Sequence, residues 1–409
     1  IRQREIMGRG RSAIVRGHIL DINQANTILV TCGPGLADFL QREIEALGFA
    51  VESVHRGGVE IKASFVDAMK LNLHLRTAYN VLYLLRQFPC DGPDELYEEV
   101  GAVAWEEIIP PNEYISIVGR IDTASIDNSM FASLKVKDAI ADRMVEKTGA
   151  RPDSGKEKRA IVINLYWRDD RAWLYLNTSG LKLTDRGYRR IPFKAPMRES
   201  LAAGLVMATG YDGAAPLVNP MCGSGTLAIE AALIAARRAP GLLRTNFGFT
   251  HLNCFDEDLW RTIRNDATKE GRKLAKKNRP ARIIATDISP DAIVAARKNA
   301  MTAGVEHLID FSVCDFADTT VPDEKGIVVV NPEYGVRLGE MGRLGGMYKR
   351  LGDFFKQKCP GWTCYIFTGN LPLAKKVGLR TSRRTAFFNA DIECRLLKYD
   401  MYQGRGQEF

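Results

Sequence analysis

Glycines and small polar residues directly follow a short apolar run in segment 219–235, NPMCGSGTLAIEAALIA. Gly223 and Gly225 allow the backbone to turn sharply and to approach a ligand closely, because glycine has no Cβ atom. The free N–H groups at the start of the helical pattern that follows favour a negatively charged or hydrogen-bond-accepting group. The spacing differs from the dinucleotide pattern G-x-G-x-x-G, and the lysine of a phosphate-binding P-loop is missing. The turn therefore indicates a different kind of ligand site.

Two carboxylates follow the next two apolar runs of the same half of the chain. Asp287 ends the run RIIATD, and Ser289 with Pro290 begins a helical pattern directly after it. A carboxylate at a strand end suits hydrogen bonds from both hydroxyls of a ribose, and it equally suits the simpler role of a helix cap. Asp315, in VCDFAD, can accept a hydrogen bond from an adenine amino group, with Phe316 beside the ring.

The fourth element is VVVNPEYG, which places Asn331, Pro332 and Tyr334 after another apolar run. An enzyme that methylates an exocyclic amine must counter the delocalisation of the nitrogen lone pair into the ring, and fixed acceptors on the N–H bonds do this. The Asn331 side-chain oxygen and the Pro332 carbonyl are suitable acceptors, and Tyr334 offers a stacking face for an extruded base. The four elements together predict a methyltransferase site for a base amino group.

The order of the expected helices and strands changes along the chain. An α+β unit, with a strand at 27–32 and helices expected at 36–48 and 65–88, precedes a second α+β region without a catalytic constellation. From residue 187 onward short apolar strands alternate with helices, which favours a mostly parallel, doubly wound sheet. Such sheets bind ligands beyond the carboxyl ends of their strands. The expected divisions are a flexible basic arm, two α+β domains and a catalytic domain, at 1–25, 26–92, 93–186 and 187–409.

The composition is that of a globular protein with an excess of basic residues. The chain has 409 residues, of which 57 are lysine or arginine and 49 are acidic, so that its net charge of +8 favours a polyanionic partner. No apolar run approaches the roughly 20 residues of a membrane span. The eight cysteines form no C-x-x-C pair, which indicates reduced thiols, no metal site and a cytoplasmic location. Basic residues gather at 186–194 and 269–282, where either a solvated surface or nucleic-acid contact fits.

These motifs resemble those of the THUMP-containing methyltransferases, and in particular the N-terminal guanine-N2 methyltransferase half of RlmL-type ribosomal RNA enzymes. The resemblance runs from about Thr27 to near Phe388. Segment 219–235 resembles the family's D-P-M-C-G-S-G-T-L-x-I-E-A-A loop, which holds S-adenosylmethionine, and APMRESLAAGLV resembles the segment that lines the cofactor site. NSMFASLKVKDAIADRM, at 128–144, is similar to a THUMP signature, and TSGLKLTDRGYRR matches the link between the two domains.

The resemblance implies a Rossmann-like class I methyltransferase domain, preceded by a small ferredoxin-like α+β unit and a THUMP domain. The implied reaction is methyl transfer from S-adenosylmethionine to the exocyclic N2 of a guanine in structured RNA, with 23S ribosomal RNA as the leading substrate. The implied catalytic residues are Asn331, Pro332, Glu333 and Tyr334. The implied cofactor-binding residues are Pro196, Glu199, Asn219, Pro220, Cys222, Gly223, Ser224, Gly225, Thr226, Asp287, Ile288, Asp315, Phe316 and Asn331. The implied RNA contacts are Lys135, Lys137, Arg189 and Arg190.

Two positions depart from the family pattern. Asn219 stands where the family usually has aspartate, and Glu333 replaces the second proline of N-P-P-Y. The Glu333 carboxylate can accept hydrogen bonds from guanine, whose N1 and N2 are both donors, whereas adenine offers one donor site. A solvent-facing loop position fits Glu333 equally well. The alternatives are a tRNA guanine-N2 methyltransferase, a DNA adenine-N6 methyltransferase, and a catalytically silent RNA-binding or ribosome-assembly factor.

Overall fold

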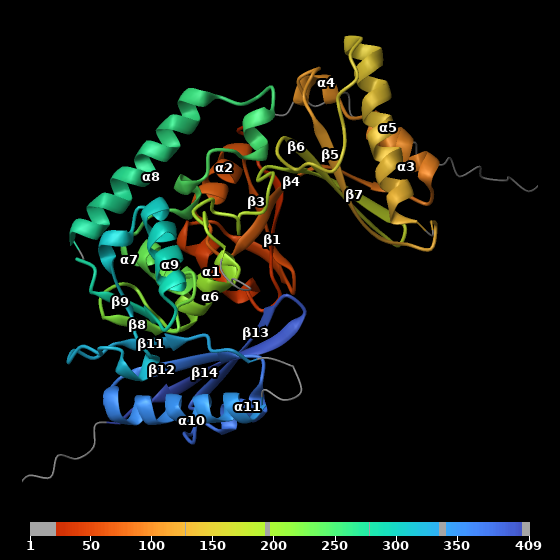
Figure 1. The fold of residues 1–409 in the computed structure, drawn as a ribbon. Helices are drawn as coiled ribbons and strands as arrows, with labels where there is room; N and C mark the ends of the chain where they lie inside the picture. Colours follow the sequence, from red (N-terminus) through yellow and green to blue (C-terminus); the bar gives the residue numbers. More distant parts are fainter. Residues whose placement is uncertain (1–21, 127, 193–196, 278, 335–340, 403–409) are drawn as a thin grey trace, which may run out of the picture. The chain divides into compact units, whose positions relative to one another are not determined.

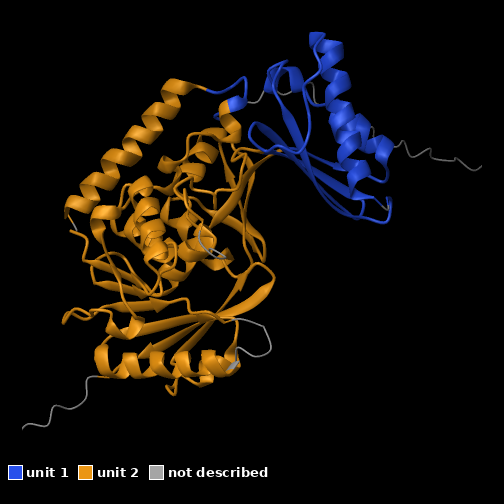
Figure 2. Cartoon of the chain, viewed as in Figure 1, with its two compact units in different colours: residues 1–24, 85–176, 251–255 blue, residues 25–84, 177–250, 256–409 orange. Residues whose placement is uncertain are grey.

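The computed structural model describes residues 22–126, 128–192, 197–277, 279–334 and 341–402. The chain divides into two compact units (Figure 2): unit 1 comprises 1–24, 85–176 and 251–255, and unit 2 comprises 25–84, 177–250 and 256–409. Most of the basic arm expected at 1–25 lies outside the described residues. Within the described part of the chain, every helix is too short or too polar to cross a membrane.

The first part of unit 2 is an antiparallel sheet with two helices, in the strand order β2-β3-β1-β4. A capping box begins the second helix, because the Ser64 hydroxyl accepts from Asp67 N at 3.2 Å while the Asp67 carboxylate accepts from Ser64 N at 3.1 Å. The strands are β1 (Asn26–Cys32), β2 (Val51–His55), β3 (Gly58–Ala63) and β4 (Ala78–Pro89), and the helices are α1 (Ala37–Ala46) and α2 (Phe65–His74).

The helix expected over 65–88 is wrong beyond His74. Leu75 adopts an extended backbone, and the chain then forms β4, which pairs with β1 from Ala78 to Tyr83. An apolar run of this length suits either a buried helix or a buried strand, and the ladder with β1 favours the strand.

Unit 1 contains the later part of β4 and a layer of helices over a sheet in the order β4-β7-β6-β5. The Asn128 side chain caps its long helix by accepting from Met130 N at 2.9 Å, and the helix ends at Gly149. Asp169 and Asp170 form the turn between two consecutive strands of this sheet, and residues 102–104 separate two of its helices. The helices are α3 (Pro93–Gly101), α4 (Trp105–Ile108) and α5 (Ser129–Thr148); the strands are β5 (Ile115–Asp122), β6 (Ile161–Arg168) and β7 (Arg171–Asn177).

The larger part of unit 2 is a seven-stranded sheet in the order β10-β9-β8-β11-β12-β14-β13 (Figure 1). The first five strands are parallel, and β14 runs antiparallel to both of its neighbours, so the predicted doubly wound sheet is confirmed. The strands are β8 (Leu217–Pro220), β9 (Ile283–Asp287), β10 (Ile309–Val313), β11 (Ile327–Val330), β12 (Thr363–Thr368), β13 (Arg383–Asn389) and β14 (Ile392–Asp400).

Helices cover this sheet, and the carboxyl ends of its parallel strands lie along one edge. Apolar residues of α10 and α11, such as Phe355 and Leu373, form a buried cluster with Ile366 and Trp362 at β12. The chain order reverses at β8, since β9 lies on one side of it and β11 on the other; such a switch point opens a crevice at the carboxyl ends. The helices are α6 (Glu199–Ala208), α7 (Thr226–Ala235), α8 (Glu257–Lys277), α9 (Pro290–Ala303), α10 (Met341–Lys358) and α11 (Leu371–Lys375).

Candidate active site

The glycine turn after β8 forms a tight loop against α9. Gly225 has a φ of 83°, and a Cβ atom there would lie 2.9 Å from the Cβ of Ala296, so this position needs glycine to let the loop pack on α9. Gly223 also has a positive φ, of 55°, but a Cβ atom added to it would meet nothing within 4 Å. The loop therefore presents an open backbone surface at the carboxyl end of β8.

Asp287, at the end of β9, fixes this loop from the neighbouring strand. One carboxylate oxygen accepts from Gly223 N at 2.9 Å, and the other accepts from Ser289 N at 2.9 Å. The N-cap of α9 is Ser289, whose hydroxyl accepts from Ala292 N at 3.3 Å. Because each carboxylate oxygen has two lone pairs, Asp287 retains acceptor capacity for a ligand that lies over the loop. Ile288 beside it is 70% exposed, which leaves an apolar side chain available for contact.

Asp315, after β10, is paired with an arginine from a distant helix. Its Oδ1 accepts from Ala317 N at 2.9 Å and from Arg350 Nη2 at 2.7 Å, and the Arg350 guanidinium lies 4.8 Å from the centre of the Phe316 ring. Burial on its own would raise the pKa of Asp315, but these hydrogen bonds outweigh it and lower the pKa. The carboxylate is therefore ionised at neutral pH, with Oδ2 available to a donor.

Two asparagines at the ends of β8 and β11 have side-chain oxygens that are buried without a partner. Asn219 donates from Nδ2 to Val329 O at 2.7 Å, but its Oδ1 and the Oδ1 of Asn331 accept no hydrogen bond from any described residue. A buried polar atom without a partner costs about 1–3 kcal/mol. Unpaired acceptors at the carboxyl ends of adjacent strands suit a ligand that carries N–H groups.

Tyr334 is held in place from two sides. Its hydroxyl accepts from Asn389 Nδ2 at 2.7 Å, and its ring meets Phe367 edge to face, with the ring centres 6.5 Å apart. Burial raises the pKa of Tyr334, so the phenol stays neutral. Pro332 is buried beside it, whereas the Glu333 side chain is 68% exposed and lies 3.0 Å from Arg343. An ion pair so exposed contributes little to stability.

A buried network of charged residues lies behind the glycine turn. Arg189 pairs with Glu199 at 3.1 Å, and its Nη2 also donates to Met197 O at 2.5 Å and to Thr226 Oγ1 at 3.4 Å. Glu230, on α7, is fully buried and accepts from the Tyr188 hydroxyl at 3.2 Å. These contacts connect α6 and the link before it to the first turn of α7.

The sequence-predicted residues fall into two groups in the structure. Those from Glu199 onward that were expected to bind the cofactor or the base lie in unit 2, at or behind the carboxyl ends of β8, β9, β10 and β11, while Pro196 lies outside the described residues. Lys135 and Lys137 lie on α5 in unit 1, where they pair with Asp94 at 3.4 Å and Asp138 at 3.2 Å. Arg189 is only 16% exposed, whereas Arg190 is exposed.

Family models match most of the chain. Residues 186–398, more than half of the chain, match the model described as RMKL-like, methyltransferase domain. The chain belongs to this methyltransferase family. Residues 27–82 match the RlmL ferredoxin-like domain, and residues 92–177 match the THUMP domain. These matches confirm the predicted combination of a ferredoxin-like unit, a THUMP domain and a methyltransferase domain.

Relatives of this methyltransferase chain include RNA-modifying enzymes. The "Putative RNA methyltransferase slr0064" of Synechocystis sp. is 32% identical over 372 residues, which cover 91% of this chain and 96% of the relative. The "Ribosomal RNA large subunit methyltransferase K/L" of Syntrophotalea carbinolica is 38% identical over 383 residues, which cover 92% of this chain and 53% of the relative. The chain thus spans about half the length of the K/L relatives that it matches.

Two solved structures share the fold along nearly the whole chain. SMU.472, "a putative methyltransferase complexed with SAH", has a TM-score of 0.82 at 25% identity, and the match covers 94% of this chain and 100% of that one. A protein from Listeria monocytogenes, described as a "predicted N6-adenine-specific DNA methylase", has a TM-score of 0.83 at 29% identity. The match covers 92% of this chain and 97% of that one. The fold of this methyltransferase is therefore shared by a protein solved with SAH and by one described as a DNA methylase.

Sequence reasoning missed two residues of the site, Arg350 and Asn389. Arg350 follows its partner Asp315 by 35 residues, and Asn389 follows its partner Tyr334 by 55. Neither residue is therefore close to its partner in the sequence. Asn389 also precedes Ala390 and Asp391, where an asparagine is typical of a hairpin turn. Only the packing of segments that are distant in the sequence brings either residue to its partner.

Glu199 makes the stability of this methyltransferase depend on pH. Burial raises the pKa of Glu199 from 4.5 to about 7, because the Arg189 guanidinium offsets only part of the cost of burying the charge. The folded protein then holds this proton more tightly than the unfolded chain. The resulting stability is fully present below pH 4.5, the pKa of an ordinary glutamate, and is lost as the pH rises through about 7.

We expect Glu199→Gln to remove this dependence, since glutamine does not titrate. Between pH 4.5 and 7, the free energy of unfolding of the wild type should fall relative to that of the variant by up to about 3 kcal/mol. Urea unfolding at several pH values measures the difference. Parallel curves for the two proteins would show that Glu199 stays ionised throughout.

Proposed function

We propose that this chain transfers a methyl group from S-adenosylmethionine to the exocyclic N2 of a guanine in structured RNA, with 23S ribosomal RNA as the leading substrate. The observation that carries the proposal is the buried Oδ1 of Asn331 at the end of β11, which has no hydrogen-bond partner among the residues that the structure describes and lies on the edge where Asp287 holds the glycine turn. The chain's membership of a methyltransferase family and its RNA-modifying relatives support the same function.

The donor fits the open side of the glycine turn. When bound, S-adenosylmethionine supplies a methyl group made electrophilic by the sulfonium. In this proposal Asp287 accepts from the ribose hydroxyls, and Asp315 accepts from the adenine amino group through its free Oδ2. Phe316 and Ile288 provide apolar contacts to the adenosine. The remaining contacts come from Glu199, Asn219, Pro220, Cys222, Gly223, Ser224, Gly225 and Thr226, with Pro196 beside them in the sequence.

The target base is held by the residues that follow β11. Asn331 Oδ1 and the Pro332 carbonyl accept from the two N–H bonds of the amine, which directs its lone pair toward the methyl group. Tyr334, kept in position by Asn389 and Phe367, stacks on the flipped base. Removing the base from its stack costs a few kcal/mol, less in a loop than in a paired helix. Correct alignment of the two reacting atoms can supply roughly 7–11 kcal/mol of the barrier reduction.

Glu333 is the residue to which we assign guanine preference. Its exposed carboxylate can leave Arg343 and accept from guanine N1 or N2, because a surface ion pair is weak. We expect Glu333→Pro to lower kcat/KM for guanine methylation by about 10- to 100-fold, since a charge-assisted hydrogen bond contributes about 1.5–3 kcal/mol. The measurement is steady-state kinetics with the RNA substrate. Unchanged or improved guanine methylation would remove the basis for this role.

The other parts of the chain bind and place the RNA in this proposal. The divisions are an arm at 1–25, a ferredoxin-like unit at 26–92, a THUMP domain at 93–186 and the methyltransferase domain at 187–409. The phosphates are contacted by Lys135 and Lys137 of the THUMP domain and by the exposed Arg190. Arg189 is paired with Glu199 and has a positioning role. The enzyme works in the cytoplasm, where its RNA is found.

Methyl transfer from labelled S-adenosylmethionine to three substrates tests the proposal. The substrates are unmodified 23S ribosomal RNA, unmodified transfer RNA and duplex DNA. We expect label in 23S ribosomal RNA, recovered as N2-methylguanosine by mass spectrometry of nucleosides. Label only in transfer RNA or only in DNA would overturn the substrate assignment. Calorimetric binding of the cofactor with no transfer to any nucleic acid would instead support a silent RNA-binding or assembly factor.

A further inference from the structure

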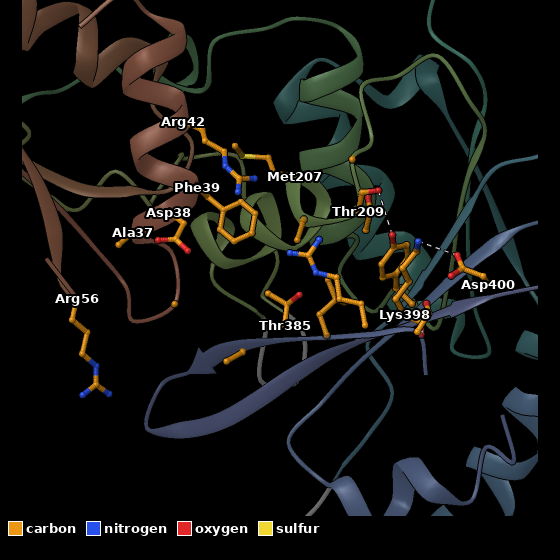
Figure 3. A pocket seen from close by; sticks show the side chains of 18 residues that line it. Ala37, Asp38, Phe39, Arg42, Arg56, Met207, Thr209, Thr385, Lys398 and Asp400 are labelled. Carbon is orange, nitrogen blue, oxygen red and sulfur yellow. Dashed lines mark hydrogen bonds and ion pairs between the residues drawn. The ribbon is translucent and has the colours of Figure 1, made fainter. Parts of the chain in front are cut away.

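A cavity of about 880 Å³ lies between α1 and the β13–β14 hairpin of unit 2 (Figure 3). Figure 3 shows Phe39 and Arg42 entering it from α1, with Thr385 and Lys398 facing them from the hairpin. The described residues that line it include none of the proposed catalytic or cofactor-binding residues. We call this cavity the hairpin groove.

Basic side chains outnumber acidic ones among the residues that line the hairpin groove. Its charged residues are Arg42, Arg56, Arg383, Lys398, Asp38 and Asp400. Lys398 pairs with Asp400 at 3.0 Å, but the guanidinium groups of the three arginines pair with no carboxylate among the residues that the structure describes. All three arginine side chains and Asp38 are exposed, so the groove offers a surplus of unpaired positive charge to solvent.

These basic groups follow β13 along most of its length. Arg383 is its first residue and lies opposite Lys398 of β14. Phe387 stacks on Phe39 with ring centres 5.6 Å apart, and Arg42 lies 5.7 Å from the centre of the Phe39 ring. A side chain on Gly35 would lie 3.0 Å from Ala386 O, which shows how closely the turn before α1 approaches this strand. The Phe39 ring, which stacks on Phe387 of β13, therefore also contacts the exposed Arg42 guanidinium.

The same strand leads to the proposed base site. Arg56 lies 5.6 Å from the centre of the Phe388 ring, and the next residue, Asn389, donates to the Tyr334 hydroxyl at 2.7 Å. At about 3.3 Å per residue, the path from Arg383 to Asn389 is about 20 Å long. Cations are therefore spaced from the far end of the strand to the residue that holds the stacking tyrosine.

We infer that the hairpin groove binds the phosphate backbone of the RNA nucleotides that flank the target base. This inference rests on the proposed function for the RNA substrate and for the base site at Tyr334. Arginine suits the role because its planar guanidinium matches the oxygens of a phosphate and stays charged. Lys398 contributes less, because Asp400 neutralises part of its charge.

Charge reversal in the groove tests the inference by RNA binding, without any methyl transfer. The variant is Arg42→Glu with Arg383→Glu, and the matched control is Lys375→Glu with Lys376→Glu, which makes the same change in charge on the exposed surface of α11. Fluorescence anisotropy with a labelled stem-loop RNA gives the affinity at several salt concentrations. Thr385→Glu is a second variant, which adds a negative charge to the groove and leaves every arginine in place.

We expect the double variant to bind the stem-loop about tenfold or more weakly, with a salt dependence reduced by about 1.4 to 1.8 in slope for two lost phosphate contacts. Thr385→Glu should weaken binding in the same direction, and the α11 control should match the wild type. Unchanged affinity and unchanged salt slope in both groove variants would overturn the inference, provided that their binding of S-adenosylhomocysteine shows that they are folded.

The outcomes separate this inference from the proposed function. A wild type that binds the stem-loop through the groove but methylates no RNA would sustain the groove and contradict the enzyme. If the wild type methylates 23S ribosomal RNA and the groove variants do so with the same KM, the proposed enzyme is supported and the groove inference is contradicted.

Discussion

Replacing Asp287 with alanine is expected to lower the affinity for S-adenosylhomocysteine by about 100-fold or more. The carboxylate fixes the glycine turn through Gly223 N at 2.9 Å and, in the proposed complex, accepts from the ribose hydroxyls. Hydrogen bonds to a charged group contribute about 1.5–3 kcal/mol each, so the loss of two of them accounts for this effect. Isothermal titration calorimetry with S-adenosylhomocysteine is the measurement.

Asp291 provides a matched control for this variant. It is an exposed acid in the first turn of α9, four residues after Asp287, and its replacement with alanine removes the same charge. We expect Asp291→Ala to change the affinity by no more than about twofold, as is usual for a surface substitution. Equal losses in the two variants would indicate that the helix, and not the ribose contact, was disturbed. An Asp287→Ala protein that is folded and binds normally would contradict the proposed cofactor site.

Replacing Asn331 with alanine is expected to lower kcat by about 100- to 1,000-fold, which is the usual effect of removing one preorganised group that acts on the reacting atoms. The Asn331 Oδ1 is buried without a hydrogen-bond partner among the described residues, so it remains available to accept from the amine of a bound base. The family resemblance also implies Asn331 as a cofactor contact, but in the proposed complex its oxygen acts on the amine of the base, so the affinity for S-adenosylhomocysteine should change by less than about threefold. Single-turnover kinetics and calorimetry measure the two quantities separately.

Asn331→Asp distinguishes the acceptor from the rest of the side chain. Aspartate keeps an oxygen at the same distance along the side chain and has no N–H group. The aspartate variant should therefore retain more activity than the alanine variant. If Asn331→Ala keeps a kcat within about threefold of the wild type, the oxygen does not act on the amine and the assignment of the base site fails.

The carboxyl-terminal edge of the large sheet could be predicted from the sequence because each of its residues follows a short apolar run. Gly223 and Asp287 lie 64 residues apart, yet both were expected at strand ends of one mostly parallel sheet, and parallel strands bring their carboxyl ends to one edge. The same rule placed Asn331 on that edge. The prediction depended only on the parallel direction of the strands, which the alternation of strands and helices already indicates.

Features that depend on pairing between distant segments could not be predicted in this way. The run 78–88 has the apolar content of a helix, and only its ladder with β1 makes it a strand. Arg350 reaches Asp315 because α10 packs beside the segment after β10. Similarly, the hairpin groove exists because the turn before α1 approaches Ala386 closely, which no pattern in either segment indicates.

A crystal structure of the protein with bound S-adenosylhomocysteine tests the central claim most directly. The account predicts that the ligand lies across the backbone of Gly223, with its ribose hydroxyls on the Asp287 carboxylate and its sulfur directed toward Asn331. A ligand bound elsewhere, or one whose sulfur faces away from Asn331, would contradict the proposed reaction.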